Sequence, residues 1–210
     1  MKRLLLLILV CTAPGAVAAA DQRVLMVLGD SISAGYGLRI EEGWVSLLQE
    51  RLHAQGYPYQ VVNASVSGDT SSTALGRLPA LIDAHHPALT VVELGGNDGL
   101  RGISPEEMHA NLERIIALLQ QAGSRVLLLP MELPPNYGPA YIDRFRAVYE
   151  RLAHETGVTL GRFLLDGIAV HPDLMQDDGI HPRALAQPKM LELVWPALST
   201  LLAPPPGAHP

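Results

Sequence analysis

Asp178 and His181 stand three residues apart in the segment Asp-Asp-Gly-Ile-His-Pro. One turn of chain can bring the aspartate carboxylate to one imidazole nitrogen and leave the other nitrogen free. A histidine held in this way is a general base suited to neutral pH, and it can activate a serine hydroxyl, which is otherwise a poor nucleophile. We predict that Ser31, in the segment Gly-Asp-Ser near the other end of the chain, is that nucleophile.

Two further segments offer hydrogen-bond donors for the negative oxygen that forms when a serine attacks a carbonyl group. Gly68 stands in Ser-Gly-Asp, and Asn97 stands in Gly-Gly-Asn-Asp. A glycine lets a backbone N–H approach closely, and an asparagine side chain adds a second donor, with the Ser31 amide as a third. Each segment alone also suits an ordinary helix start or turn. Together they supply the parts that acyl transfer needs, which favours the catalytic interpretation.

The other histidines have no equally good carboxylate partner beside such a segment. Most fall in helical or helix-end patterns, one precedes a proline in a loop, and one stands in the C-terminal tail. We therefore predict that these histidines are exposed to solvent. They are His53, His85, His86, His109, His154, His171 and His209.

The segments of Ser31, Gly68 and Asn97 each follow a short apolar run that is typical of a buried strand. Such runs occur at residues 24–28, 60–62, 90–94 and 125–129, and a weaker one occurs at residues 158–163. Alternating strands and helices predict an α/β fold, a three-layer α/β/α sandwich with a parallel sheet and right-handed crossovers. Ligands bind at the carboxyl ends of such strands, where we expect the segments to converge.

Helical spacing of apolar residues marks the segments between the strands. Pro188 suits the first turn of the last helix, and Pro196 predicts a kink in it. The apolar faces comprise Trp44, Leu48 and Leu52; Met108, Leu112, Ile115, Ile116 and Leu119; Tyr141, Phe145, Val148 and Leu152; and Leu191, Val194, Trp195, Leu198 and Leu202.

The N-terminus has the layout of a secretory signal peptide: a cationic start, a short apolar run and small residues up to residue 20. The apolar run is too short to span a bilayer. A lipidated Cys11 is a minor alternative, because Val10 precedes it where a small residue is expected. We therefore expect a periplasmic or secreted protein with a signal peptide at residues 1–20, one domain at 21–203 and a disordered proline-rich tail at 204–210.

Charge and composition narrow the possible partners. Without Lys2 and Arg3, the mature chain has 13 basic and 21 acidic side chains, a net charge of −8. This balance argues against nucleic acid, which requires a concentrated basic face. The mature chain also has no cysteine, so it uses neither disulfides nor thiol chemistry.

These segments, in this order, resemble the GDSL (SGNH) hydrolase superfamily. A more specific resemblance is to a bacterial subgroup, the periplasmic acyl-CoA thioesterase/protease/lysophospholipase enzymes and their arylesterase relatives. It rests on Leu-Gly-Asp-Ser at 28–31, Ser-Gly-Asp-Thr-Ser at 67–71, Val-Glu-Leu-Gly-Gly-Asn-Asp-Gly-Leu-Arg-Gly at 92–102 and Met-Gln-Asp-Asp-Gly-Ile-His-Pro at 175–182. The match extends from about residue 23 to about residue 202.

The resemblance implies a flavodoxin-like, five-stranded parallel sheet and no metal or organic cofactor. We also expect a monomer without stable membrane insertion. The resemblance implies that the catalytic residues are Ser31, Asp178 and His181, and that the oxyanion hole is formed by Ser31, Gly68 and Asn97. The substrates it implies are esters, thioesters or lysophospholipids of medium to long acyl chains. The expected substrate-binding residues are Leu100 and Arg101, in a loop that moves on acyl binding, and Leu133 and Pro134. Glu132 departs from the family pattern, and an acidic residue lining the pocket would change chain-length preference.

Other classes of protein share parts of this pattern. A carbohydrate O-acetyl esterase could use the same residues with a smaller acyl pocket. A nucleotide-binding or redox domain is disfavoured, because Gly35-Tyr36-Gly37 lacks the third glycine of the dinucleotide pattern and no P-loop occurs. A zinc protease lacks its second histidine after His154-Glu155, and an α/β-hydrolase would carry a G-x-S-x-G segment. A catalytically inactive acyl-binding protein is disfavoured, because the sequence supplies a residue for every catalytic role.

Overall fold

A single five-stranded parallel sheet lies at the centre of the chain, in the computed structural model that describes residues 22–204. Its strand order is β2-β1-β3-β4-β5, the flavodoxin-like order, so the predicted fold class is confirmed. The predicted signal peptide lies outside the described residues, as does all of the predicted tail except Pro204. The strands are β1 (Arg23–Gly29), β2 (Tyr59–Asn63), β3 (Leu89–Glu93), β4 (Arg125–Leu128) and β5 (Thr159–Leu160).

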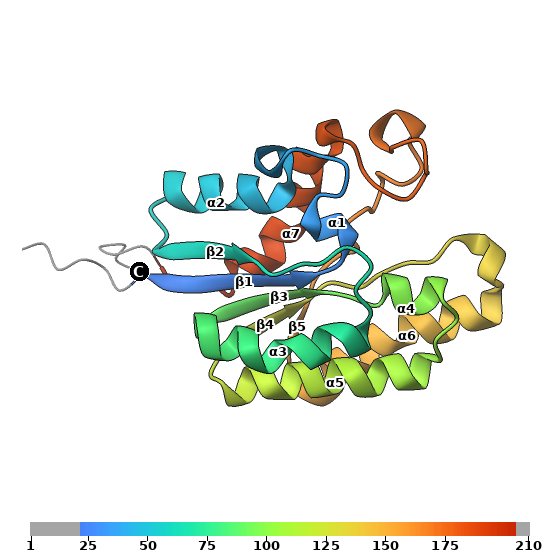
Figure 1. Ribbon diagram of the computed structural model, residues 1–210, viewed down its shortest axis with the longest axis horizontal. Coiled ribbons are helices and arrows are strands. Elements are labelled where there is room, and N and C mark those ends of the chain that lie inside the picture. Colours follow the sequence, from blue (N-terminus) through green and yellow to red (C-terminus); the bar gives the residue numbers. More distant parts are fainter. Residues whose placement is uncertain (1–21, 205–210) are drawn as a thin grey trace, which may run out of the picture.

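Helices cover both faces of the sheet, which gives the three layers visible in Figure 1. α2 and α7 lie on one face, and α3, α5 and α6 lie on the other. Two short helices, α1 and α4, follow β1 and β3 directly. The bounds are α1 (Ser31–Ala34), α2 (Trp44–Ala54), α3 (Ser71–His85), α4 (Gly96–Leu100), α5 (Pro105–Gln121), α6 (Pro139–Thr156) and α7 (Gln187–Ser199).

The sheet separates two apolar cores, because successive side chains of a strand point to opposite faces. Leu25 and Val27 of β1 pack with α2 and α7, whereas Met26 and Leu28 pack with α3, α5 and α6. The near-continuous apolar sequence of β1 follows from this burial on both sides. The two cores fix the end of β1, and therefore the place where Ser31 begins.

The first four predicted strands agree with the structure to within one residue at each end, but the fifth was predicted too long. β5 pairs with β4 only at Thr159 and Leu160, instead of extending to residue 163. Beyond Leu160 the backbone makes one more hydrogen bond to β4, in which the Gly161 N–H donates to the Leu128 carbonyl at 2.8 Å.

The sequence patterns did not indicate α3, because Gly76 and Pro79 interrupt its helical character. Its N-terminus is instead fixed by Thr70, whose side chain accepts a hydrogen bond from the Thr73 N–H. Pro196, where we predicted a kink, lies inside α7, and that helix continues to Ser199. Among residues 22–204, no helix combines the length and apolar character needed to cross a bilayer.

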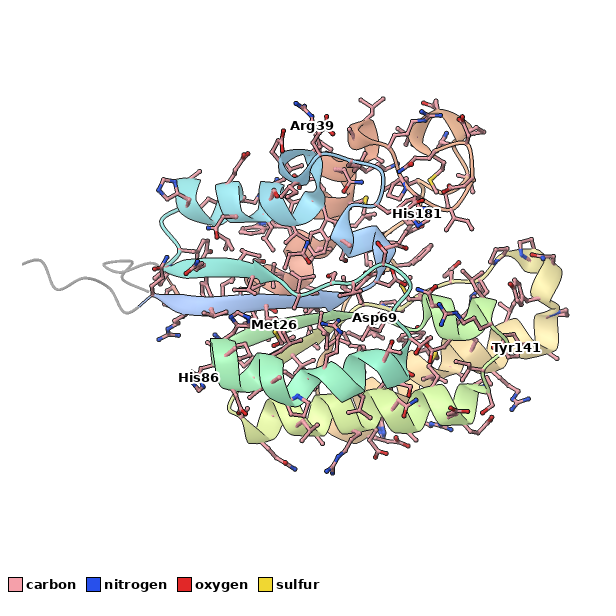
Figure 2. The ribbon with its side chains drawn as sticks, in the orientation of Figure 1. Met26, Arg39, Asp69, His86, Tyr141 and His181 are labelled. Carbon is pink, nitrogen blue, oxygen red and sulfur yellow. The ribbon has the colours of Figure 1, made fainter. Side chains whose placement is uncertain are left out.

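The carboxyl ends of all five strands point to one end of the molecule, where α1, α4 and the segment between β5 and α7 also lie (Figure 1). Figure 2 shows His181 and Asp69 at this end and His86 at the opposite end of the sheet. The topology therefore brings segments from distant parts of the sequence to one rim.

Candidate active site

Ser31 is the first residue of α1, directly after β1. The helix cap is Asp30, whose carboxylate accepts a hydrogen bond from the Ile32 N–H at 3.0 Å. Ser31 therefore does not act as the cap, the simpler role that its sequence also allowed. As the first helical residue it has an N–H without an intrahelical acceptor, and that group remains available to a ligand.

A continuous series of hydrogen bonds joins Ser31 to Asp178 through His181. Ser31 Oγ lies 2.8 Å from His181 Nε2, and His181 Nδ1 lies 2.6 Å from Asp178 Oδ2. The other carboxylate oxygen, Oδ1, accepts from the backbone N–H groups of Ile180 and His181, at 2.9 and 3.0 Å. The aspartate thus holds both the imidazole ring and the turn that carries it.

Those hydrogen bonds also keep Asp178 ionised. Donation from the His181 backbone, the His181 ring and the Ile180 backbone lowers the pKa of Asp178 from 3.8 to about 2, although 39% of the side chain is exposed. A negative charge therefore remains beside Nδ1 throughout the neutral range. It favours the tautomer with a proton on Nδ1 and leaves Nε2 free to accept the serine proton.

Gln176 and Tyr36 hold the histidine loop against the loop after α1, and sequence reasoning missed both. The Gln176 side chain donates to the Tyr36 carbonyl at 2.8 Å, and its backbone N–H donates to the His181 carbonyl at 2.7 Å. The Tyr36 ring lies 4.5 Å from the His181 ring, centroid to centroid. A side chain on Gly37, at φ 77°, would collide with Gln176. These contacts fix the direction of the imidazole toward Ser31.

Asn97 and Gly68 both reach the turn that carries Ser31. The Asn97 side chain donates to Asp30 at 3.0 Å, which places its amide beside the residue before Ser31. The segment that leads to Gly68 runs alongside the end of β1, with the Val66 N–H donating to the Gly29 carbonyl at 3.1 Å. Gly68 itself has φ 85°, a conformation that favours glycine.

The donors of these residues are available to a bound group. In the part of the chain that the structure describes, neither the Ser31 N–H nor the Gly68 N–H donates a hydrogen bond, and Asn97 uses only one of its two amide hydrogens. Free N–H groups of this kind can stabilise a negative oxygen that develops next to the serine.

Leu100 and Arg101 lie in the loop that ends α4, close to Gly68. Arg101 donates to the Gly68 carbonyl at 2.9 Å, and the Tyr137 hydroxyl donates to the Leu100 carbonyl at 3.1 Å. The Leu100 side chain is partly exposed. The structure therefore brings both predicted substrate-binding residues of this loop to the rim of the site.

The other predicted substrate-binding residues are placed differently. Leu133 is buried, and its side chain packs against Gly99, next to Leu100. Pro134 is exposed at the start of a short turn. The Glu132 carboxylate accepts a hydrogen bond from Arg146 of α6 at 3.0 Å, so its charge is paired on the surface of α6.

Two buried carboxyl groups lie beneath the site, and neither was predicted from the sequence to have a role there. Asp30 is 2% exposed and Glu93, the last residue of β3, is 0% exposed. Burial raises the pKa of Asp30 to about 6, and burial together with the Asp30 charge raises the pKa of Glu93 well above its usual range. The signal that could have revealed Glu93 is an acidic residue at the end of an otherwise apolar strand.

Stability should depend on pH through Asp30. Its pKa is higher in the folded chain, about 6, than in the unfolded chain, 3.8. The folded state therefore binds more protons in that window, and the free energy of unfolding falls as pH rises through it. Asp30→Asn keeps a cap acceptor but cannot ionise. Relative to wild type, this variant should gain on the order of 2–3 kcal/mol between about pH 4 and pH 7, measured by urea denaturation.

Asp173→Asn, at an exposed position, is the control for that measurement. The prediction is wrong if the difference in unfolding free energy between wild type and Asp30→Asn does not change with pH.

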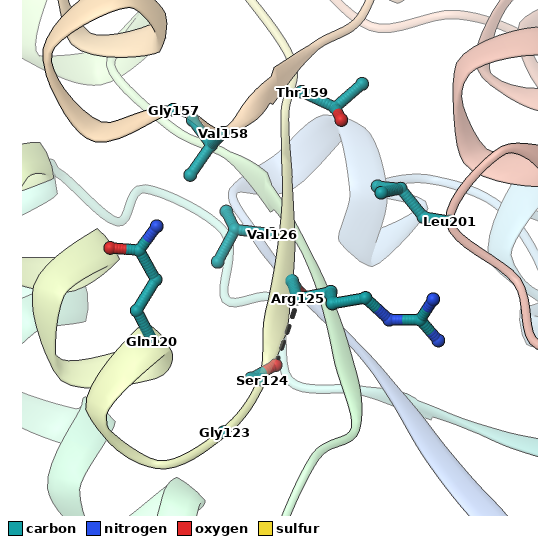
Figure 3. Close-up of a pocket in the computed structure, with 9 residues that line it drawn as sticks. All are labelled: Gln120, Gly123, Ser124, Arg125, Val126, Gly157, Val158, Thr159 and Leu201. Atoms are coloured by element: carbon teal, nitrogen blue, oxygen red, sulfur yellow. Dashed lines mark hydrogen bonds between the residues drawn. The ribbon is translucent and has the colours of Figure 1, made fainter.

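The cavity drawn in Figure 3 lies far from this site. It has a volume of about 270 Å³ and is lined by residues at the amino ends of β4 and β5, among them Arg125 and Thr159. It is therefore at the opposite end of the sheet from Ser31. Two of the histidines predicted to be exposed are only partly exposed, His85 and His109. The His109 side chain is 12% exposed and pairs with Glu155 at 2.9 Å.

The α/β/α sandwich carries a serine, a histidine and an aspartate in a hydrogen-bonded series at the carboxyl ends of its strands. This is the architecture of a serine hydrolase. The sequence pattern of the GDSL-like Lipase/Acylhydrolase family matches residues 27–187, and the chain belongs to this family.

Individual relatives agree with that assignment. The chain is 52% identical to Esterase TesA of Pseudomonas aeruginosa over 183 residues, which is 87% of this chain and 91% of the relative. It is 43% identical to Thioesterase 1/protease 1/lysophospholipase L1 of Escherichia coli K12 over 185 residues, 88% and 86% of the two chains. A crystal structure of TesA superposes with a TM-score of 0.84 at 52% identity and covers 86% of this chain and 100% of that one.

Proposed function

We propose that the chain hydrolyses esters and thioesters of medium to long acyl chains through an acyl-enzyme on Ser31. The observation that carries this proposal is the uninterrupted series from Ser31 Oγ through both ring nitrogens of His181 to Asp178. Membership of the acylhydrolase family supports the reaction type. The names of the relatives, which include esterase, thioesterase and lysophospholipase, support the substrate class.

The geometry supports a two-step acyl transfer. His181 Nε2 takes the proton of the Ser31 hydroxyl as its oxygen attacks the substrate carbonyl carbon, and the carbonyl oxygen becomes negative. When the intermediate collapses, His181 gives the proton to the departing alcohol or thiol, and the acyl group stays on Ser31. A water molecule then attacks the acyl-enzyme with His181 as base, and the carboxylic acid leaves. Asp178 stays ionised throughout and stabilises the imidazolium.

Asn97→Ala should lower turnover by about 10²–10³-fold, the usual effect of removing one oxyanion donor. In the proposed mechanism the free hydrogen of the Asn97 amide meets the negative oxygen, together with the Ser31 and Gly68 N–H groups. Steady-state kinetics on a p-nitrophenyl ester measures the effect, and thermal unfolding shows whether the variant is folded. Turnover within a few-fold of wild type would contradict this role and show that Asn97 only supports the turn.

A panel of substrates tests the acyl-chain proposal directly. The mature protein is given p-nitrophenyl esters from acetate to palmitate, acyl thioesters of the same lengths and a lysophospholipid. We expect kcat/KM to be highest on acyl groups of about eight or more carbons, with thioesters and esters both hydrolysed. A preference for acetate over octanoate would contradict the proposal and favour an O-acetyl esterase.

We also propose that the protein is exported and acts in the periplasm or outside the cell. The support for this proposal is the composition of residues 1–20. Expression of the full chain in a bacterium, followed by mass spectrometry of the periplasmic fraction, tests it. A mature N-terminus near residue 21 is expected, and an uncleaved chain confined to the cytoplasm would contradict the proposal.

A further inference from the structure

Glu93 is a fully buried acidic side chain directly beneath the turn that carries Ser31. It ends β3, the central strand of the sheet, and is 0% exposed. One carboxyl oxygen, Oε2, accepts hydrogen bonds from the Ser33 hydroxyl at 2.6 Å and, at 3.4 Å, from the Asp30 N–H. The other, Oε1, is buried without a partner among the described residues. Burying a carboxyl group with one unpaired oxygen costs free energy of folding, which favours a specific role for Glu93 over simple packing.

The two groups that Glu93 holds stand on either side of Ser31. Asp30 precedes it directly and Ser33 follows it by two residues. The fit is tight, because a side chain on Gly29 would come within 2.6 Å of Glu93 Oε2 and 2.9 Å of Ser33. Glu93 therefore holds the nucleophile turn, residues 30–33, by two hydrogen bonds.

Asp30 extends this network to the oxyanion side of the site. Its carboxylate accepts one hydrogen bond from the Ile32 N–H and one from the Asn97 amide, both at 3.0 Å. A shift of the turn would thus move the Ser31 hydroxyl relative to His181 and move Asn97 at the same time. The catalytic groups and the buried acids form one connected unit.

We propose that Glu93 is a positioning residue for acyl transfer, holding the nucleophile turn through Ser33 and Asp30 so that the Ser31 hydroxyl meets His181 Nε2. The inference rests on the proposed function of Ser31. Glu93 does not touch substrate, and its effect is exerted through the geometry of the turn.

The raised pKa of Glu93 indicates which substitution should preserve its positioning role. Asp30 and Glu93 are both buried, and the Asp30 N–H donates to Glu93 Oε2. Burial and the Asp30 charge raise the pKa of Glu93 well above its usual range. Both effects disfavour the charged form of the Glu93 carboxyl group. Glutamine is neutral, has the same shape and keeps an oxygen that can accept from Ser33. Alanine removes both hydrogen bonds to the turn.

The test compares Glu93→Gln with Glu93→Ala in the mature protein, on an ester that wild type hydrolyses. For Glu93→Ala we expect kcat to fall by about 10–100-fold with KM within about threefold, because misplaced reacting groups affect turnover more than ground-state binding. The rate of phosphonylation by a fluorophosphonate should fall in parallel. Glu93→Gln should restore kcat to within about threefold of wild type, since it keeps the acceptor.

Two further variants keep the proposal falsifiable if Glu93→Ala folds poorly. Ser33→Ala removes one hydroxyl, and its kcat should fall by about 3–10-fold, roughly the loss of one hydrogen bond. Thr90→Val is the matched control: it breaks the buried hydrogen bond to Ser124, at 2.9 Å, near the amino end of the same strand. It should lower the melting temperature and leave kcat unchanged.

A purely structural role would give a different pattern. Glu93→Ala and Ser33→Ala would then lower the melting temperature, as Thr90→Val does, and keep wild-type kcat below it, which would overturn the proposal. A Glu93→Gln variant as slow as Glu93→Ala would overturn it as well. Absence of ester hydrolysis by wild type would instead contradict the proposed function, so the two failures are distinguishable.

Discussion

Ser31→Ala is expected to lower ester hydrolysis by roughly 10⁴–10⁶-fold, the scale at which loss of a serine nucleophile abolishes the acyl-enzyme route. Alanine has no oxygen to attack the carbonyl carbon, and what remains comes from the oxyanion donors and from substrate binding. The hydroxyl contributes one hydrogen bond, to His181 at 2.8 Å, and the helix cap is Asp30. We therefore expect the variant to fold normally, with a melting temperature within a few degrees of wild type.

The measurement is kcat/KM on one activated ester, with enzyme concentrations high enough to follow a loss of this size. Ser46→Ala is a suitable control, because its hydroxyl caps a surface turn by donating to the Ile40 carbonyl at 2.7 Å. It should keep wild-type activity. A Ser31→Ala variant that retains more than about a hundredth of wild-type activity would exclude Ser31 as the nucleophile.

His181→Ala is expected to have an effect of similar size, about 10⁴–10⁶-fold, because an unassisted serine hydroxyl is a poor nucleophile near neutral pH. The histidine also supplies the proton to the leaving group, so both halves of the reaction lose their acid or base. Combining His181→Ala with Ser31→Ala should add little to either single loss. Residues that act as one unit give effects that are far from additive.

Kinetics of the two single variants and the double variant test this expectation on the same ester. His154→Ala replaces an exposed histidine on α6 and should behave as wild type. Independent contributions from Ser31 and His181, with losses that multiply in the double variant, would contradict a shared proton path between them.

The positions of Ser31, Asn97 and His181 could be predicted because a parallel sheet brings the carboxyl ends of its strands to one rim. Ser31 and Asn97 each follow a buried apolar strand, so the topology alone places them together. Asp178 and His181 are close in sequence, and their hydrogen bond needs only one turn of chain. In these cases local pattern and topology were sufficient.

Other parts of the site depend on contacts between side chains that are distant in sequence. Glu93 meets Ser33 across 60 residues, and Gln176 meets Tyr36 across 140 residues, so neither pairing leaves a local pattern. Leu133 illustrates the same limit. The sequence predicts that Leu133 lies near the site, but its contact with Gly99 appears only in the structure.

The elements that were missed share a different cause. The apolar run at residues 158–163 predicted a longer β5, but only Thr159 and Leu160 pair with β4, and apolar composition does not record where pairing ends. In α3 the tertiary environment overrides the local signals of Gly76 and Pro79. Propensity is weak where packing and capping decide where an element begins and ends.

The most direct test of the central claim, that Ser31 carries the acyl group, is mass spectrometry of the protein after reaction with a fluorophosphonate. We predict a single adduct per chain, located by peptide fragmentation on Ser31, with labelling that is lost in Ser31→Ala and strongly slowed in His181→Ala. An adduct on another residue, or undiminished ester hydrolysis by a chain fully labelled at Ser31, would contradict it.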